Sequence, residues 1–207
     1  SGTTRGNGNR WVEVDPETLS SSDGMTDYAE VDYDVYAADY AGKYVFFATL
    51  DGIYAADQEE LDLAQKVADF SGFDANEMVA DMAFNTKDSK MYVLTNTISN
   101  IANGQIGAAG NKLYRLDPVT GDLTKIADVT ITHPTNQTAQ TLTLRAMAID
   151  DNGNFYAVNA GTSTVVQLYQ WTLDEISASG VLTVEAPGVK MTTSGLYTSS
   201  YASMAYD

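Results

Sequence analysis

Cysteine is absent from this sequence of 207 residues, which excludes disulfide bonds and zinc sites with cysteine ligands. Basic residues are also scarce, because 11 Lys and Arg stand against 28 Asp and Glu, giving a formal net charge of −17. A surface of this charge repels phosphate groups and anionic lipids, so we expect neither a nucleic-acid partner nor binding to a membrane surface. No apolar run approaches the roughly 18 residues of a membrane-spanning helix, and we expect no membrane insertion.

Histidine is nearly as rare, since His133 is the single copy in the sequence. It lies in the polar stretch Ile131–Asn136, and no nucleophile-elbow pattern accompanies it, so a Ser-His-Asp triad is not indicated. The glycines at 104, 107 and 110 lack the Lys-Ser/Thr ending of a phosphate-binding loop. We therefore predict no catalytic residues of these classes and no bound cofactor.

What the sequence does contain is a repeated phrase with Met-Ala at its centre. It occurs in the three segments Asp81–Asn85, Ala146–Asp150 and Ser203–Asp207. The first two are each followed by a polar turn and then by a β-rich run, Met91–Thr95 or Phe155–Asn159. A more degenerate copy occupies residues 36–49. Short β-rich runs joined by Asn-Gly or Lys-Asp turns are typical of hairpins.

A second hairpin follows the first in each copy. Its clearest instance is residues 113–128, where Asp117-Pro118 opens a turn and Gly121 supplies the positive φ that closes it. Residues 53–70 and 168–184 repeat this arrangement with more variation. The apolar residues within 57–70 also fit a helical spacing, but the alignment of the repeats favours a strand there.

The spacing of the repeats predicts the fold. Met82 and Met147 are 65 residues apart, and Met147 and Met204 are 57 apart. Four strands per unit at this spacing predict an all-β fold, a β-propeller of four-stranded antiparallel blades. The expected blades are residues 31–73, 76–131 and 140–188, with a split blade that combines 10–29 and 198–207. Ser1-Gly2 resembles a tag remnant, and we expect residues 1–9 to be disordered.

The split blade follows from both ends of the chain. Trp11–Thr18 aligns with Leu113–Thr120, a third strand, whereas the sequence ends on a first strand. No second strand is visible for this blade, so either an incomplete fourth blade closes a small ring or the chain is truncated after Asp207, which we favour. The repeat also predicts inner-strand positions for Met82, Phe84, Met147, Ile149, Met204 and Tyr206. It predicts positions between blades for Tyr92, Tyr114, Tyr156 and Tyr169.

Two segments carry a resemblance to known proteins. Tyr92–Asn96 followed by Leu113–Gly121 resembles the blade repeats of bacterial surface-layer and quinoprotein-type propellers, in which a Tyr-Val-Thr-Asn strand precedes an Asp-Pro-x-Thr-Gly turn. The resemblance covers most of the chain at the level of blades. Leu94 interrupts the tetrapeptide, and the gap between the two segments is longer than usual. Because the matching positions are structural, the resemblance implies no quinone or metal site.

Carboxylates are the remaining source of catalytic groups. Inner-strand ends are where propeller glycosidases place paired carboxyl groups, and the aspartates expected there are Asp39, Asp81, Asp150 and Asp207. Three of them share one repeat position, which Asn85 fills in the remaining copy, and this favours a role in the hairpin turn. The oxygen-rich residues 150–154 would also suit Ca²⁺, but a tight hairpin prefers the same residues, so we predict no metal site.

Long connections provide a better indication of function. Those after the second and fourth strands of a blade share one face of a propeller, and here they are residues 96–111, 130–140 and 186–199. Such loops on a rigid scaffold often bind ligands, although inert connectors have the same small, polar composition. The binding residues that we predict there are Asn100, Asn103, Gln105, His133, Asn136 and Tyr197.

The sequence therefore favours a non-enzymatic module, secreted or at the bacterial cell surface, that binds a protein or carbohydrate ligand. The alternative is a carbohydrate-active hydrolase that uses inner-strand aspartates. An intracellular scaffold is a third reading. Nothing in the sequence indicates an oligomeric state.

Overall fold

The computed structural model describes residues 9–14, 25–31, 33–100, 105–132, 143–160 and 168–185. In these ranges the chain is all-β. The strands are β1 (Asn9–Val14), β2 (Met25–Val31), β3 (Ala37–Ala41), β4 (Tyr44–Ala48), β5 (Gly52–Asp57), β6 (Gln65–Asp69), β7 (Glu77–Asn85), β8 (Lys90–Asn100), β9 (Gln105–Leu116), β10 (Leu123–Thr132), β11 (Thr143–Ile149), β12 (Phe155–Ala160), β13 (Leu168–Trp171) and β14 (Val181–Glu185). Two short 3₁₀ helices, η2 (Leu61–Leu63) and η4 (Leu173–Glu175), lie between strands.

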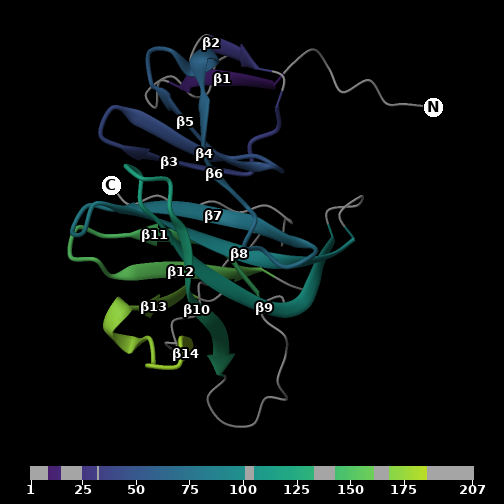
Figure 1. Ribbon diagram of the computed structural model, residues 1–207, viewed down its shortest axis with the longest axis vertical. Coiled ribbons are helices and arrows are strands. Elements are labelled where there is room, and N and C mark those ends of the chain that lie inside the picture. Colours follow the sequence, from purple (N-terminus) through teal and green to yellow (C-terminus); the bar gives the residue numbers. More distant parts are fainter. Residues whose placement is uncertain are drawn as a thin grey trace.

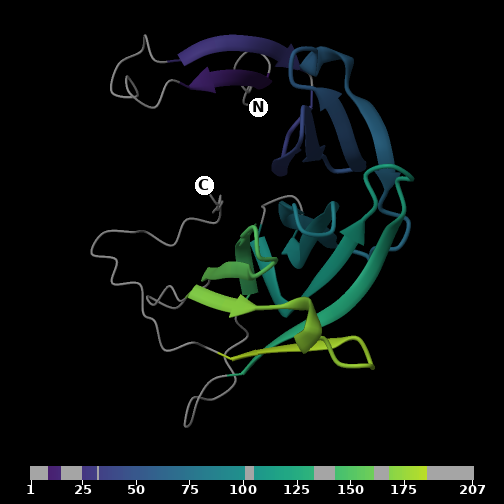
Figure 2. The ribbon, with the colours of Figure 1, turned by 90° about the vertical axis from the view of Figure 1, so that its left-hand side faces the viewer.

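The described strands form four sheets. They are the N-terminal hairpin β1-β2, the first sheet β3-β4-β5-β6, the second sheet β14-β10-β9-β8-β7 and the third sheet β11-β12-β13. Neighbouring strands are antiparallel except for β10 and β14. The sheets stack in this order (Figure 1), and seen from the side they follow an arc (Figure 2). The predicted all-β architecture of successive antiparallel sheets is confirmed.

The turns are closed by the side chains that the sequence indicated. Oδ1 of Asp117 accepts hydrogen bonds from the amides of Val119 (2.9 Å) and Thr120 (3.4 Å). Gly121 adopts a φ of +77° and donates its amide to the carbonyl oxygen of Asp117. This geometry is open to glycine and strained for other residues, so the Asp-Pro-x-Thr-Gly sequence specifies the β9-β10 hairpin. Within residues 57–70 the strand reading is also confirmed, since β6 follows the single turn of η2.

One predicted loop is largely a strand pair. Residues 96–111 were expected to be a long connection, yet β8 continues to Asn100 and β9 begins at Gln105. The two strands stay paired through Ile98 opposite Ile106 to Asn100 opposite Gln105, with register shifts on the way. The Gly, Ala and Asn content of these residues is typical of a connector. The pairing of β8 with β9 nevertheless continues beyond the residues that pair with β7 and β10. We call residues 97–100 and 105–110 the ribbon.

The position of β14 corrects a second prediction. Residues 168–184 were expected to form the outer hairpin of the third unit, but β14 pairs in parallel with β10 of the second sheet. Among the described residues, the third sheet therefore has three strands. Leu182 and Val184 are fully buried in the core between the second and third sheets. Alternation in the sequence identifies their buried face but does not specify which strand lies alongside.

The described residues form three apolar cores between consecutive sheets. Tyr92, Tyr169 and Met147 belong to the core between the second and third sheets. Met82 and Tyr114 belong to the core between the first and second sheets. The three tyrosines thus lie between successive sheets, and Met82 and Met147 lie on β7 and β11, the strands predicted to be inner strands. Each fully buried large side chain contributes about 1.5–3 kcal/mol, so these cores hold the sheets together.

Tyr156 is placed differently from the other repeat tyrosines. It is partly buried, and its hydroxyl donates to Oδ2 of Asp150 at 3.2 Å. Its neighbours Phe155 and Ala157 face the second sheet within the buried core. Because side chains alternate along a strand, Tyr156 faces the opposite side of the third sheet.

Gly121 provides a test of how closely the sheets approach. A Cβ at this position would lie 2.2 Å from the carbonyl oxygen of Val67 on β6, whereas a Cβ at Gly42, with φ of +65°, would meet nothing within 4 Å. We expect Gly42→Ala to cost about 1–2 kcal/mol for its backbone conformation. Gly121→Ala should cost about 1–3 kcal/mol more, because the neighbouring sheet must shift. Urea unfolding of both variants measures this difference, and equal losses would contradict the close approach.

Candidate functional site

The candidate site lies where the ribbon leaves the second sheet. Glu77 at the start of β7 pairs with Thr97, and on the other side of the hairpin β10 reaches Asn111 of β9 at Val129. Beyond these residues β8 and β9 pair with each other as the ribbon. The structure places two predicted binding residues, Asn100 and Gln105, opposite each other near its tip.

The other predicted binding residues lie outside the described part of the chain. They are Asn103, His133, Asn136 and Tyr197. Met204, Tyr206 and Asp207, which the repeat assigns to an inner strand, are outside it as well. These assignments stay predictions.

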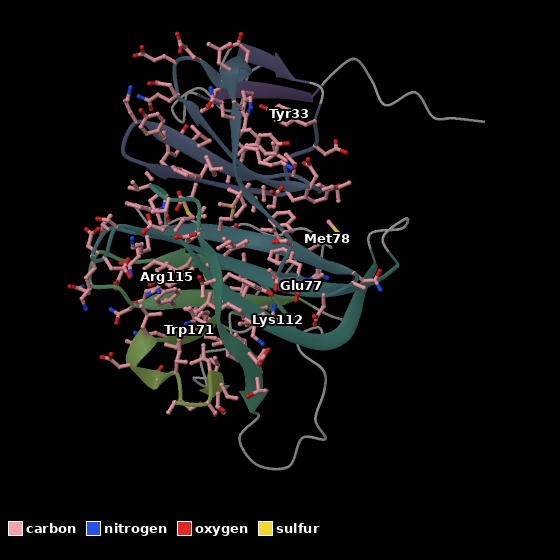
Figure 3. The ribbon with its side chains drawn as sticks, in the orientation of Figure 1. Tyr33, Glu77, Met78, Lys112, Arg115 and Trp171 are labelled. Carbon is pink, nitrogen blue, oxygen red and sulfur yellow. The ribbon has the colours of Figure 1, made fainter. Side chains whose placement is uncertain are left out.

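A buried ion pair anchors the base of the ribbon. The side chain of Glu77 is 1% exposed, and its Oε2 accepts a hydrogen bond from Nζ of Lys112 at 2.8 Å. Figure 3 shows the two side chains beside each other, projecting from β7 and β9. Oε1 of Glu77 accepts the hydroxyl of Thr95 at 2.5 Å, and Oε2 also accepts the amide of Asp74 at 2.8 Å. Both carboxylate oxygens are thus hydrogen-bonded, which a buried charge requires.

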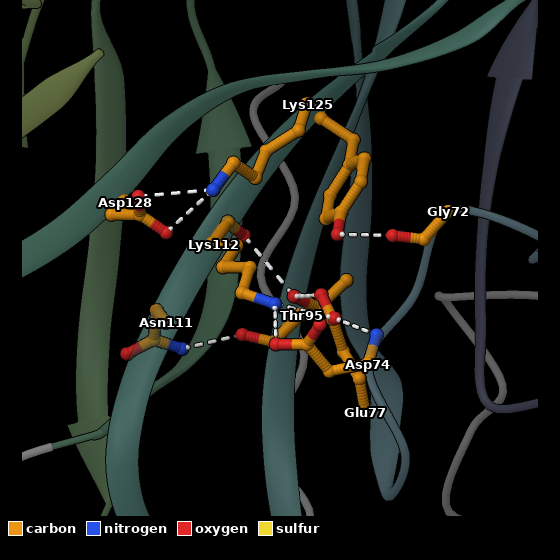
Figure 4. Close-up of polar contacts among 9 residues, drawn as sticks. Gly72, Asp74, Glu77, Thr95, Asn111, Lys112, Lys125 and Asp128 are labelled. Atoms are coloured by element: carbon orange, nitrogen blue, oxygen red, sulfur yellow. Dashed lines mark hydrogen bonds and ion pairs between the residues drawn. The ribbon is translucent and has the colours of Figure 1, made fainter. Parts of the chain in front are cut away.

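Lys112 connects this buried pair to the surface. Its Nζ also lies 2.6 Å from Oδ2 of Asp74, whose side chain is 75% exposed. Burial alone would lower the pKa of Lys112, but the hydrogen bonds that its ammonium group donates to Asp74 and Glu77 outweigh burial and raise the pKa. The hydrogen bond from Lys112 is in turn the main cause of the lowered pKa of Asp74. Figure 4 shows the resulting network across β7, β8 and β9. Because the pKa of Lys112 is raised, its ammonium group stays charged at neutral pH.

Two buried amides extend the anchor to the third sheet. Asn96 and Asn111 both donate from Nδ2 to the carbonyl oxygen of Leu144 on β11, at 2.8 and 2.9 Å. In return the amide of Leu144 donates to Oδ1 of Asn111 at 2.7 Å. The two asparagines are also bonded to each other at 2.6 Å. These hydrogen bonds hold the base of the ribbon to the third sheet, and the bond between the two asparagines holds β8 to β9 within the second sheet.

Two inner-strand aspartates also join successive sheets. Oδ2 of Asp39 on β3 accepts the amide of Phe84 on β7 at 2.6 Å, and Oδ2 of Asp81 on β7 accepts the amide of Met147 on β11 at 2.8 Å. Each Oδ1 accepts the amide of the next residue in its own strand, at 2.8 and 2.9 Å. Burial raises the pKa of Asp39, while its two backbone hydrogen bonds act in the opposite direction. All four oxygens are therefore engaged by backbone amides.

The repeat predicts a turn role for both Asp39 and Asp150. This is wrong for Asp39, which joins two sheets through the amide of Phe84, and it is confirmed for Asp150. Its Oδ1 accepts the amides of Asn152 and Asn154 at 3.0 and 2.8 Å, and its Oδ2 accepts the side-chain amide of Asn154 at 2.8 Å. The side-chain bond from Asn154 is the main cause of its lowered pKa. Within the described ranges, no three Asp, Glu or His side chains gather where they could hold a metal ion.

The ion pair and the amide cluster were not predicted from the sequence. Glu77 and Asn111 are buried polar residues and Lys112 is a partly buried one, and polar residues within strands that pack between sheets were the available signal. Their partners are between 15 and 35 residues away along the chain. The partners become evident once the hairpin register is known.

Comparisons with known proteins support the architecture. No protein-family model matches the sequence, and neither does any curated protein. Among solved structures, an oligogalacturonate lyase in complex with manganese matches with a TM-score of 0.50 at 12% identity, over 89% of this chain and 43% of the lyase. The extracellular domain of BT4673 from B. thetaiotaomicron matches with a TM-score of 0.42 at 18% identity, over 78% of this chain and 19% of that protein.

These similarities concern the fold alone. A puromycin-hydrolyzing peptidase from Mycobacterium tuberculosis matches with a TM-score of 0.43 at 13% identity, over 79% of this chain and 22% of the peptidase. The chain thus spans less than half the length of each of the three proteins. The lyase is β-propeller-like, which supports propeller architecture for this chain. Among the described residues there is no helix with the length and apolar character needed to cross a bilayer.

Replacing Lys112 tests the anchor of the ribbon. Lys112→Met leaves the carboxylate of Glu77 buried without its cation, so we expect a loss of about 3 kcal/mol in the free energy of unfolding. Asp74→Asn removes an exposed partner of the same lysine and should cost little, because exposed pairs contribute little. Chemical denaturation of both variants measures the two losses. A stability for Lys112→Met equal to that of Asp74→Asn would contradict the buried pair.

Proposed function

We propose that this chain is a non-enzymatic binding module with propeller architecture, in a protein that is secreted or displayed at the bacterial cell surface. The ligand, a protein or a glycan, contacts the ribbon and the connections around it. The single observation that carries this proposal is the anchored ribbon, which extends beyond the second sheet while its base is held by Lys112 and Asn111. A projecting element that is fixed before binding has less conformational entropy to lose on binding.

The bonding of the aspartates favours binding over the hydrolase alternative. A glycosidase needs one carboxyl group that can give up a proton and a second that attacks or activates water. Asp39 and Asp81 instead accept backbone amides at all four oxygens. Asp150 is occupied by its own turn. These three groups thus have structural partners where a hydrolase would need carboxyl groups facing substrate.

The role of the ribbon is tested by paired variants. The chain is first assayed on a glycan array and against a displayed peptide library, and the affinity for each ligand found is then measured by calorimetry. Asn100→Ala combined with Gln105→Ala should weaken binding at least tenfold, about 1.4 kcal/mol, because both residues lie near the ribbon tip. Val119→Ala is the control, since Val119 is 90% exposed in the turn at the opposite end of β9. Equal affinities for both variants, or no ligand in either format, would contradict the proposal.

The hydrolase alternative has its own measurement. We expect the chain to release no reducing ends from neutral or acidic polysaccharides over prolonged incubation at pH 4–8, a range that covers the usual pKa values of glycosidase carboxyl groups. Release that is lost in Asp81→Asn, with the fold checked by circular dichroism, would establish the hydrolase and overturn the binding module.

A further inference from the structure

The position of β14 departs from the rule that the rest of the chain follows. Among the described strands, β2 pairs with β1, β6 with β5 and β10 with β9, and each of these pairs is antiparallel. β14 follows the turn at Gly180 but leaves β13 and pairs in parallel with β10. The edge of β10, and not a hairpin, therefore determines where β14 lies.

The edge of β10 fits β14 along its whole length. Five residue pairs are in register, from Asp128 opposite Val181 to Thr132 opposite Glu185. Leu182 and Val184 are 0% and 1% exposed in the core between the second and third sheets. The hydroxyl of Thr130 lies 3.4 Å from that of Thr183. Backbone pairing with alternate apolar side chains buried is the pattern of strand addition to a sheet edge.

The segment that carries β14 makes its hydrogen bonds locally. We call residues 172–180 the link. Among the described residues, its bonds join members of the link to one another or to Val181, including the capping box formed by Thr172 and Glu175. The exception is the carbonyl oxygen of Gly180, which accepts the amide of Asp128 at the start of the β10-β14 pair. The link can therefore move away with its own bonds intact, giving up the partial packing of Leu173 and Ile176.

We propose that β14 is exchanged between two copies of this chain, so that β14 of each copy pairs with β10 of the other in a twofold dimer. The same five-residue register and the same buried side chains form in either arrangement, because the donor strand is identical. What differs is the loss of translational freedom, so the dimer fraction rises with protein concentration. A second copy is the occupant whose complementarity to this edge the structure already displays.

The absence of cysteine from the sequence allows a direct test. Thr130→Cys and Thr183→Cys are made as two separate variants, mixed in equal amounts, unfolded and refolded together at increasing concentration, and then oxidised. Neither variant can form a disulfide within its own chain. A disulfide joining positions 130 and 183 requires β14 of one copy to lie on β10 of the other. Peptide mapping should show this mixed disulfide several-fold above the two like disulfides, in a dimer sized by light scattering.

A matched pair in the first sheet serves as the control. Tyr44 and Asp57 lie opposite each other in the β4-β5 hairpin, which has no long link. Tyr44→Cys mixed with Asp57→Cys should show no excess of the mixed disulfide. A random distribution at positions 130 and 183, or a dimer without the mixed disulfide, would overturn strand exchange. If the cysteine variants fail to fold, exchange is measured with the unsubstituted chain, as mixed-mass dimers from co-refolded ¹⁵N-labelled and unlabelled protein; purely monomeric protein at every concentration would overturn it.

Discussion

The sheets of this protein face one another, and between the first, second and third of them the backbone hydrogen bonds run within a sheet rather than across. Apart from the backbone pairing of β14 with β10, these interfaces are therefore held by side chains. Apolar cores supply most of the contact, and Asp39 and Asp81 supply polar joins from one inner strand to the backbone of the next. A carboxylate suits this role because it has two acceptor oxygens. One oxygen accepts a backbone amide of its own strand, and the other accepts a backbone amide of the next sheet.

Two features follow from this constraint. The ribbon extends past the cores, so its base needs polar anchors, and Lys112 and Asn111 provide them from adjacent positions of β9. β14 is the one described strand that carries backbone pairing from the third unit to the second sheet. β14 joins the second and third units at β10, whereas Asp81 joins them at the inner strands β7 and β11. The second and third units are thus joined at both ends of their contact.

The sequence specified the β9-β10 hairpin well, because the determinants of its turn are local. Asp117 and Gly121 adopt the expected turn geometry, and Tyr92 lies in a core where the repeat placed it. Partners far along the chain were harder to infer. The alternation around Leu182 is the same whether β14 lies beside β13 or β10, and the small residues of the ribbon resemble a connector until the register of β8 and β9 is known. The pairing of Glu77 with Lys112 depends on that same register, so it could not be read before the fold.

Charge constrains what such a surface can bind. Within the described ranges, lysines at positions 43, 66, 90, 112 and 125 make ion pairs with aspartate or glutamate. These five cations have partners within the molecule, and the 28 acidic residues far outnumber the 11 basic residues of the sequence. The long-range field is negative, which slows the approach of anionic ligands and speeds that of cationic ones. For the proposed binding module, this field favours neutral glycans and basic protein surfaces over anionic ligands, and salt should weaken binding of a basic protein far more than binding of a neutral glycan.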